Sequence, residues 1–350
     1  MRRTLAAAVA GGALLLAGCS SAATTGAAGG IPSSQGTAAA AVAAPVTVRL
    51  GFLENLTHAS ALVGIKEGFF TKALGSAGTL QTTPFSTGTE EATALLAGQL
   101  DVAYVGPNPA ISAFQKSNGT AIKIISGAAT GGASIVVKAG ITSASQLKGQ
   151  SLATPSLGNT QDVALRYWLQ QDGLKTTTTG GGDVYIKPTT PNSAAVLEFK
   201  SGQIAGGSEP APYDVEMVSD GGHVLLSEPG VTTVMIVTQS FLAAHPAVVA
   251  DLLKAQIEAN DFIKSNTAAA EADVNAELGS LTGKPLKASV LAASFKEITF
   301  TDDPDEASFT ADAQQATSLG LLKSASLSGI FDLTPLNTAL AAAGEAQVGS

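Results

Sequence analysis

The stretch "SLATPSLGNTQDVALRYWL" (151–169) predicts a short apolar strand, a polar turn and a helix, in that order. The turn contains a glycine, Gly158, followed by three uncharged hydrogen-bonding side chains, Asn159, Thr160 and Gln161. A second stretch, "DVAYVGPNPAISAF" (101–114), repeats the order of strand, polar turn and helix. The two turns are either ordinary helix caps or the two halves of one binding site.

The pattern around these stretches predicts an α/β protein of two lobes. Strands such as "VTVRLGFL" (46–53) alternate with helices such as "HASALVGIKEGFF" (58–70), which indicates parallel sheets layered by helices. From about residue 246 helices dominate, giving a helical C-terminal part. We assign residues 46–137 with 232–346 to lobe 1 and residues 138–231 to lobe 2.

Composition limits the classes of function. The 350 residues are 45% hydrophobic and 13% charged, with a formal net charge of −9. A chain of this length can bury a large core. Because nucleic-acid binding needs a basic surface, the acidic balance argues against such a partner. The acidic balance does not argue against a small anionic ligand, because nearby hydrogen-bond donors can bind such a ligand.

The N-terminal segment predicts export. Residues 1–18 form a signal peptide, with Arg2 and Arg3 before a short apolar run. The run ends in Leu-Ala-Gly-Cys, which resembles the lipobox of bacterial lipoproteins and marks Cys19 for lipidation, although a plain secretory signal with an accidental cysteine is the alternative. Residues 19–45 then read as the lipidated cysteine and a flexible linker rich in Ala, Ser, Thr and Gly. We therefore expect the protein outside the cell membrane, anchored to it through lipid on Cys19.

Signatures of catalysis, cofactors and metals are missing from the sequence. We find no Gly-x-Ser-x-Gly elbow, no phosphate-binding loop and no Gly-x-Gly-x-x-Gly after a strand. The three histidines, His58, His223 and His245, lack metal-ligand spacing. The run "DDPDE" (302–306) reads as a solvated loop that caps a helix. We expect no cofactor, no bound metal and no enzymatic activity.

Polar turns before helices are the chemistry that the sequence does offer. The first backbone N–H groups of a helix lack partners within it, and the helix dipole adds partial positive charge. Such turns bind anions without a cationic side chain. They recur at 53–60, 85–91, 105–110, 126–134 and 156–162. Each alone reads as an ordinary cap, whereas five across two lobes favour a shared anion site.

Few charged side chains are candidates for that site. Beyond the signal peptide the only arginines are Arg49, within a strand, and Arg166. The apolar stripe on the helix of Arg166 predicts that this side chain faces water. Glu209, in "GGSEPAPY", is expected in a loop connecting the lobes, where it either accepts from a ligand or bonds to nearby backbone.

Together these motifs resemble the substrate-binding lipoproteins of ABC importers for aliphatic sulfonates, taurine and nitrate. The resemblance covers the chain from about Val48 to the C-terminus and is carried by the order and spacing of five stretches. These are "LGFLENLTHASALVGIKEGFF", "ALLAGQLDVAYVGPNPAI", "SGAATGGASIVV", "ATPSLGNTQDVALRYWL" and "SEPAPY". The resemblance implies a type II periplasmic-binding-protein fold, in which two lobes joined by two crossings close over a ligand in a cleft.

The resemblance also implies which residues line that cleft, and all of them lie in the polar turns or beside a crossing. In lobe 1 and at the first crossing they are Asn55, His58, Ser86, Thr87, Gly106, Pro107, Asn108, Gly132, Ala133 and Ser134. In lobe 2 they are Gly158, Asn159, Thr160, Gln161 and Glu209.

The sequence departs from the family pattern at two places. Glu54 stands where many relatives have proline, and a carboxylate facing the cleft would repel an anion. Ala211 follows Glu209 and Pro210 where relatives often have tryptophan, so an aromatic wall is missing. Both departures leave the identity of the ligand open.

The resemblance predicts a monomeric solute-binding protein that captures an organosulfonate-type anion and delivers it to a permease and its ATPase subunit. Nitrate, or a neutral or cationic heterocycle such as a thiamin pyrimidine precursor, is the alternative ligand. An enzyme on the same fold is the alternative class, since one fold can host several functions. In that case His58 and Glu209 are the candidate reactive groups.

Overall fold

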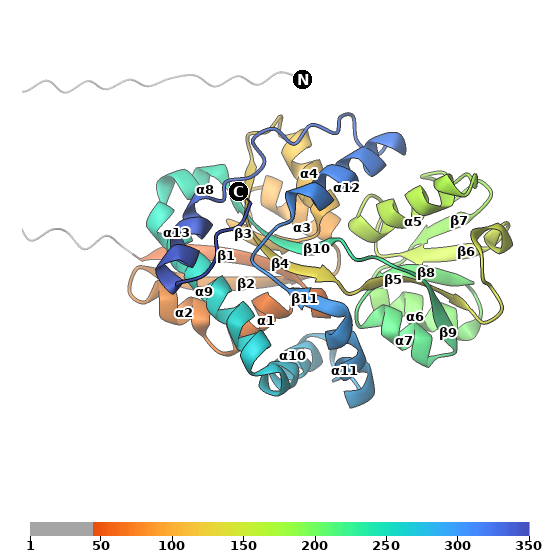
Figure 1. Cartoon of the computed structure of the whole chain (residues 1–350), viewed down its shortest axis with the longest axis horizontal. Helices are drawn as coiled ribbons and strands as arrows, with labels where there is room; N and C mark the ends of the chain where they lie inside the picture. Colours follow the sequence, from red (N-terminus) through yellow and green to blue (C-terminus); the bar gives the residue numbers. More distant parts are fainter. Residues whose placement is uncertain (1–44, 350) are drawn as a thin grey trace, which may run out of the picture. The chain divides into compact units, whose positions relative to one another are not determined.

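Two sheets, a six-stranded and a five-stranded one, organise residues 45–349, the part of the chain that the computed structural model describes (Figure 1). The predicted signal peptide, Cys19 and nearly all of the linker lie outside the described residues. The first sheet, in its spatial order, consists of β11 (Ile298–Phe300), β4 (Ile122–Gly131), β10 (Val231–Thr238), β3 (Val102–Val105), β1 (Val46–Leu53) and β2 (Gly78–Phe85). The second consists of β7 (Tyr185–Pro188), β6 (Ser151–Thr154), β8 (Gly206–Pro210), β5 (Ala133–Lys138) and β9 (Gly222–Ser227).

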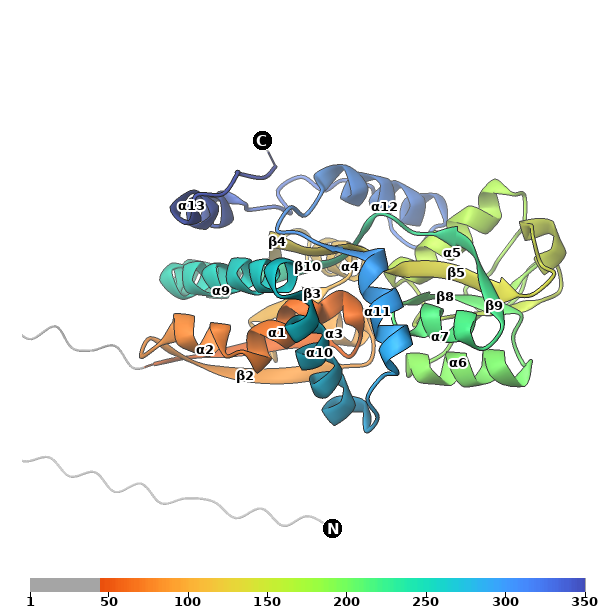
Figure 2. The same ribbon diagram turned by 60° about the horizontal axis from the view of Figure 1, so that its bottom comes forward.

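Helices cover both faces of each sheet (Figures 1 and 2). We call the first sheet with its helices lobe 1 and the second sheet with its helices lobe 2. The helices of lobe 1 are α1 (Ala59–Lys66), α2 (Phe69–Leu74), α3 (Gly88–Leu96), α4 (Pro107–Lys116), α8 (Gln239–Ala244), α9 (Pro246–Ser265), α10 (Thr267–Thr282), α11 (Ala288–Glu297), α12 (Glu306–Ser318) and α13 (Thr334–Ala343). Those of lobe 2 are α5 (Thr160–Gln171), α6 (Asn192–Ser201) and α7 (Tyr213–Ser219). No helix in the described part of the chain is both long and apolar enough to span a membrane.

Both sheets are mixed, whereas the alternating pattern predicted parallel ones. β1 pairs in parallel with β2 and β3, and β6 with β7 and β8. The strands next to the crossings run the other way: β10 is antiparallel to β3 and β4, and β5 is antiparallel to β8 and β9. Because these strands enter a sheet from the other lobe, no crossover helix sets their direction.

The chain passes between the sheets twice. The first passage is at Gly132, since β4 ends at Gly131 and β5 begins at Ala133. This lies a few residues before the boundary expected at residue 137, because β5 pairs with lobe 2. The second passage runs from Glu228 to Gly230, close to the expected boundary. The passages run side by side, because the Gly131 N–H donates to the Gly230 carbonyl at 2.9 Å.

Two local predictions were wrong for identifiable reasons. The helix expected over 58–70 is broken into α1 and α2 by Gly68, whose φ of 73° is left-handed. The loop 302–306 is not wholly solvated, because Asp302 is only 5% exposed. The expected cap is confirmed, since Asp305 accepts from the Ser308 N–H at the start of α12.

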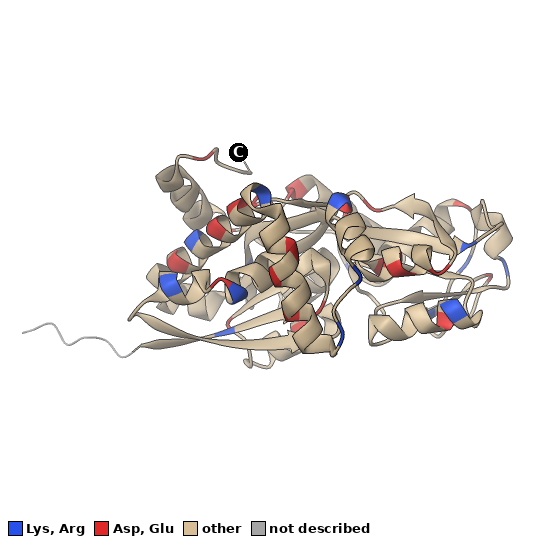
Figure 3. Ribbon diagram, turned by 90° about the horizontal axis from the view of Figure 1, so that it is seen from below, with Lys and Arg blue, Asp and Glu red and all other residues tan. Residues whose placement is uncertain are grey.

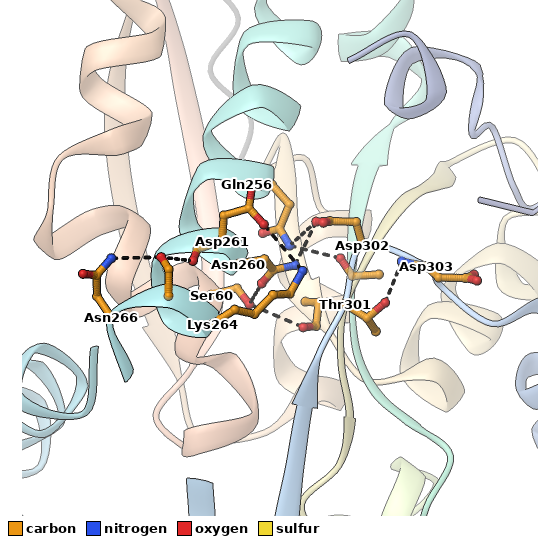
Figure 4. Close-up of polar contacts among 12 residues, drawn as sticks. Ser60, Gln256, Asn260, Asp261, Lys264, Asn266, Thr301, Asp302 and Asp303 are labelled. Atoms are coloured by element: carbon orange, nitrogen blue, oxygen red, sulfur yellow. Dashed lines mark hydrogen bonds and ion pairs between the residues drawn. The ribbon is translucent and has the colours of Figure 1, made fainter. Parts of the chain in front are cut away.

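Asp302 belongs to a buried polar network that fastens α9 to the first sheet (Figure 4). Its Oδ1 accepts from Asn260 Nδ2 at 2.8 Å and from Gln256 Nε2 at 3.3 Å. Ser60 on α1 donates to Asn260 Oδ1 at 2.6 Å. Burial raises the pKa of Asp302 to about 6, because the lost hydration outweighs the stabilisation of the carboxylate by Lys264, Gln256 and Asn260.

Candidate functional site

A cavity between the two lobes is the candidate site. The starts of helices from both sheets surround it: the turn Leu56–His58, α3 and α4 from lobe 1, and α5 and α6 from lobe 2. Its empty volume, counting space open to solvent, is about 380 Å³, while the enclosed space has room for little more than one water molecule. The cavity is lined by Leu53, Asn55, Thr57, His58, Ser86, Thr87, Gly88, Gly106, Pro109, Pro155, Asn159, Thr160, Gln161, Asn192, Pro210 and Thr232.

Side-chain caps fix where three of these helical segments begin. Asn55 Oδ1 accepts from the Thr57 N–H at 3.0 Å, Thr87 Oγ1 from the Glu90 N–H at 3.3 Å, and Asn159 Oδ1 from the Asp162 N–H at 2.9 Å. Each cap satisfies one of the four N–H groups that a helix start leaves without intrahelical partners. The remaining N–H groups and the helix dipoles provide partial positive charge around the cavity.

His58 contributes a neutral side chain. It is 1% exposed, and its Nδ1 accepts from the Leu53 N–H at 3.2 Å. Burial lowers the pKa of His58 to about 3, so the ring is uncharged at neutral pH. With Nδ1 as the acceptor, the proton is on Nε2, and the ring can donate one hydrogen bond.

Two buried polar groups in the lobe 2 wall have no partner among the described residues. Thr160 Oγ1 and Asn192 Oδ1 are both shielded from solvent and make no hydrogen bond. Buried polar atoms are almost always paired, so an unpaired one needs an explanation. A ligand in the cavity would supply partners for both.

No lysine or arginine lines the cavity, and Arg166 lies elsewhere. The prediction that Arg166 faces water was wrong: the residue is 2% exposed, and its Nε donates to Asp162 Oδ2 at 2.9 Å. The expected apolar stripe overlooked Leu165 and Leu169, which are buried against the second sheet with Trp168 beside them. Arg166 shares their buried side of the helix, and its charge is compensated there by Asp162.

The structure brings eight of the predicted site residues together at the cavity. They are Asn55, His58, Ser86, Thr87, Gly106, Asn159, Thr160 and Gln161. The other predicted residues do not line it: Pro107, Asn108, Gly132, Ala133, Ser134, Gly158 and Glu209. A role in ligand binding stays a prediction for both groups.

Glu209 is not in a loop, contrary to expectation. It belongs to β8 and is fully buried, and neither of its carboxyl oxygens has a hydrogen-bond partner. Burial raises its pKa well above the usual range, and Asp214 and Glu228 raise it further. Its neighbour Pro210 lines the cavity instead.

The remaining lining residues were missed by sequence reasoning. Asn192 opens α6, so the rule that identified the other turns could have found it. Thr57, Gly88 and Pro109 lie within recognised turns, next to residues that were chosen. The residues around Thr232 show no pattern that indicates a site, because Thr232 lies at the cavity only where the chain returns from lobe 2 to lobe 1.

The two departures from the family pattern lie beside the cavity and not in its wall. Glu54 is partly buried, and burial raises its pKa; its carbonyl accepts from the Tyr213 hydroxyl at 3.1 Å. Ala211 is fully buried, and its carbonyl accepts from the Leu56 N–H at 2.9 Å.

The lobes meet closely beside the cavity. Thr89 Oγ1 on α3 donates to Ser156 Oγ of lobe 2 at 3.0 Å. Gly106 packs so tightly on lobe 2 that a Cβ atom there would lie 2.6 Å from Thr160 Oγ1. The arrangement is therefore a closed one, with the cavity shielded between the lobes. Residues 45–349 contain no cluster of three His, Asp or Glu that could hold a metal ion.

A sequence model of the NMT1-like family matches residues 41–277, which is more than half of the chain. The chain belongs to the NMT1-like family. This match covers β1 to α9 and therefore every residue that lines the cavity. No curated protein sequence matches the chain.

Solved structures share the fold at low sequence identity. The alkanesulfonate-binding protein SsuA from Xanthomonas axonopodis pv. citri, bound to MOPS, superposes with a TM-score of 0.69 at 16% identity, covering 83% of this chain and 99% of its own. The periplasmic nitrate-binding protein NrtA from Synechocystis PCC 6803 has a TM-score of 0.68 at 16% identity, with 85% of this chain and 89% of NrtA covered. A mutant of DszB in complex with biphenyl-2-sulfinic acid has a TM-score of 0.60 at 15% identity, with 84% of this chain and 99% of DszB covered. The periplasmic-binding-protein fold expected from the sequence is thus confirmed.

Proposed function

We propose that the protein is the extracytoplasmic solute-binding component of an ABC importer and captures a small organosulfonate-type anion between its lobes. The observation that carries the proposal is the convergence of five helix starts, from both lobes, on one closed cavity. Backbone N–H groups, the neutral His58 and the hydroxyl of Thr160 replace the hydration of the oxyanion. The ligand favours closure only by its preference for the closed state.

The ligand is then delivered unchanged to a permease and its ATPase subunit. In this proposal the protein acts as a monomer held to the outer face of the membrane by lipid on Cys19, which lies outside the described residues. Sulfonate- and nitrate-binding proteins share its fold, which supports an oxyanion ligand, and the small cavity favours a short organic tail. Nitrate or a thiamin pyrimidine precursor is the alternative ligand, although the cavity wall has no Phe, Tyr or Trp side chain for stacking on a heterocycle.

Catalysis on the same fold is the weaker candidate. It would need an activated nucleophile or an acid–base group at the ligand, and the cavity wall contains Ser86 and several threonines but no cysteine, lysine or carboxylate. Its one titratable side chain, His58, is a weak base, because burial lowers its pKa to about 3. Recovery of an intact ligand after prolonged incubation supports binding alone, whereas a product would favour the enzyme.

Thermal-shift screening against taurine, short alkanesulfonates, nitrate and pyrimidines tests the proposal. A ligand present at 100 times its Kd should add about 2.7 kcal/mol of stability. Thr160→Val is the matched variant, because it removes the unpaired hydroxyl at nearly constant shape. We expect it to retain its unliganded stability and to bind the sulfonate about 2- to 10-fold more weakly. A shift with a pyrimidine and with none of the sulfonates would refute the choice of ligand.

A further inference from the structure

Hydrogen bonds within lobe 1 fix which end of the Asn55 side chain is available to a ligand. A backbone N–H group can only donate, so the atom that accepts from it is an oxygen or an unprotonated nitrogen. The Thr57 N–H and the Thr57 hydroxyl both donate to Asn55 Oδ1, at 3.0 and 2.8 Å. The Thr233 hydroxyl donates to Thr57 Oγ1 at 3.1 Å, which leaves the proton of Thr57 for Asn55. Asn55 Nδ2 is therefore the end of the amide that a ligand meets.

The same reasoning fixes two more side chains of the cavity wall. The Leu53 N–H donates to His58 Nδ1, so the proton of this ring is on Nε2. In lobe 2 the Asp162 N–H donates to Asn159 Oδ1 at 2.9 Å, which makes Nδ2 the donating end of Asn159. That nitrogen donates to Gln161 Oε1 at 3.0 Å. Gln161 therefore has only its Nε2 left for a ligand.

The three fixed side chains offer donors and no acceptor. Asn55, His58 and Gln161 all line the cavity. Asn55 Nδ2, His58 Nε2 and Gln161 Nε2 have no hydrogen-bond partner within residues 45–349, whereas the acceptor atom of each side chain is already used. A ligand atom placed beside any of these nitrogens has to be an acceptor.

Three other polar side chains of the wall can turn. Thr160 Oγ1 and Asn192 Oδ1 are buried without partners among the described residues, and no hydrogen bond fixes Ser86. A hydroxyl that accepts a proton from a ligand leaves its own proton unpaired, and an amide that turns its oxygen inward turns its nitrogen away. A proton on the ligand therefore costs a hydrogen bond at these positions too.

Charged side chains offer no means of telling apart two anions of equal charge. Among the described residues, no lysine, arginine, aspartate or glutamate lines the cavity. Figure 3 shows that charged residues of both signs are sparse and scattered over the ribbon. Selection between two anions of the same charge and shape therefore depends on the hydrogen bonds of the wall.

We propose that the fixed donors make the cavity select oxyanions whose oxygens carry no proton, with Thr57 and Asn159 as positioning residues that act through Asn55 and Gln161. Sulfonates and nitrate belong to the selected class. Anions of the same charge that keep a hydroxyl, such as a phosphonate monoanion, are disfavoured. The inference rests on the proposed function, because it assumes that an oxyanion binds in this cavity.

Isothermal titration calorimetry with methanesulfonate and methylphosphonate at about pH 5 tests the selection. The two anions have nearly the same shape, and at this pH, below the second pKa of a phosphoryl group, methylphosphonate has one negative charge and one hydroxyl. His58 stays neutral there, because its pKa is about 3. We expect the wild-type protein to bind methanesulfonate about 5- to 150-fold more tightly, the cost of leaving one buried donor unpaired.

Asn159→Ser tests the positioning role. Serine can still accept from the Asp162 N–H and cap α5, but it has no N–H group for Gln161 Oε1. Gln161 can then turn its oxygen toward a proton on the ligand, so the ratio of the two affinities should fall about 2- to 10-fold. Thr238→Ser is the matched control and should keep the wild-type ratio, because Thr238 caps α8 at the opposite end of β10 from the cavity-lining Thr232.

Two results would overturn the inference. One is a wild-type protein that binds methylphosphonate as tightly as methanesulfonate, or more tightly. The other is an Asn159→Ser variant with the wild-type ratio. If methanesulfonate, nitrate and methylphosphonate all fail to bind, the proposed function is refuted and the inference with it, so the two failures are distinguishable.

Discussion

Asp162 and Arg166 form a buried ion pair one turn apart on α5, with Oδ2 and Nε separated by 2.9 Å. The same carboxylate accepts from the Gly158 N–H at 2.9 Å and from Thr154 Oγ1 at 3.0 Å. Asp162 therefore ties the end of β6, the turn before α5 and the helix itself together. The pair supports the lobe 2 wall of the cavity without touching it.

Breaking this pair should destabilise lobe 2. Asp162→Asn leaves the guanidinium of Arg166 buried without a counter-charge, and we expect a loss of about 3–5 kcal/mol in the free energy of unfolding. Urea unfolding monitored by circular dichroism measures the loss. Asp251→Asn disrupts an exposed pair with Lys254 and serves as the control, with little change expected. Equal losses in both variants would contradict the assigned role.

Asn159→Asp should weaken anion binding without removing the cap of α5. The new carboxylate can still accept from the Asp162 N–H, but it adds negative charge to the cavity wall. We expect the affinity for a short alkanesulfonate to fall about 5- to 150-fold, since a like charge a few ångströms away costs on the order of 1–3 kcal/mol. Isothermal titration calorimetry measures the change. Asn266→Asp, which is exposed and remote, controls for net charge; unweakened binding by Asn159→Asp would mean that the turn is only a cap.

Gly106→Ala should hinder closure of the lobes. The added Cβ would lie 2.6 Å from Thr160 Oγ1 of the other lobe, which is closer than carbon and oxygen pack. Ligand affinity should fall, while the unliganded stability changes little. The double variant Gly106→Ala/Thr160→Ala removes the clashing hydroxyl and should recover part of the affinity in calorimetry. A single variant that binds as the wild type does would show that this contact is absent when ligand binds.

Stability should fall as the pH rises from about 4 to 6 because of Asp302. Its native pKa of about 6 lies above its unfolded value near 3.8, so the native state holds a proton that the unfolded state has lost. The stabilisation is complete below about pH 4 and is lost as the pH passes 6; the shift corresponds to roughly 3 kcal/mol. Asp302→Asn should remove this part of the pH dependence in thermal unfolding. An unchanged profile in the variant would place the proton on another group.

Periodicity and turn residues were enough to predict the helices and strands that build the lobes. α5 begins at Thr160, directly after the strand and polar turn predicted for residues 151–169, and helices dominate from Pro246 onward, as expected. These features are local, since caps and apolar spacing decide them. The turns at Asn55, Thr87 and Asn159 were recognisable for the same reason.

Features that depend on distant partners were not predictable. Arg166 is buried because Asp162 and the second sheet enclose it. The spacing of apolar residues on its helix predicted that the side chain faces water, which was wrong. Glu209 looked like a loop residue because Gly and Pro flank it, yet pairing with β5 makes it part of a strand. Asp302 was predicted to be solvated, because its hydrogen-bond partner Asn260 lies far away in the sequence.

The contact between Thr89 and Ser156, which joins the two lobes beside the cavity, bears on residence time. A molecule enclosed between the lobes can leave only when they separate, so its dissociation rate cannot exceed the rate of opening. Two ligands of unequal affinity would then leave at similar rates whenever opening is the slow step. The difference between their Kd values would then come from their association rates.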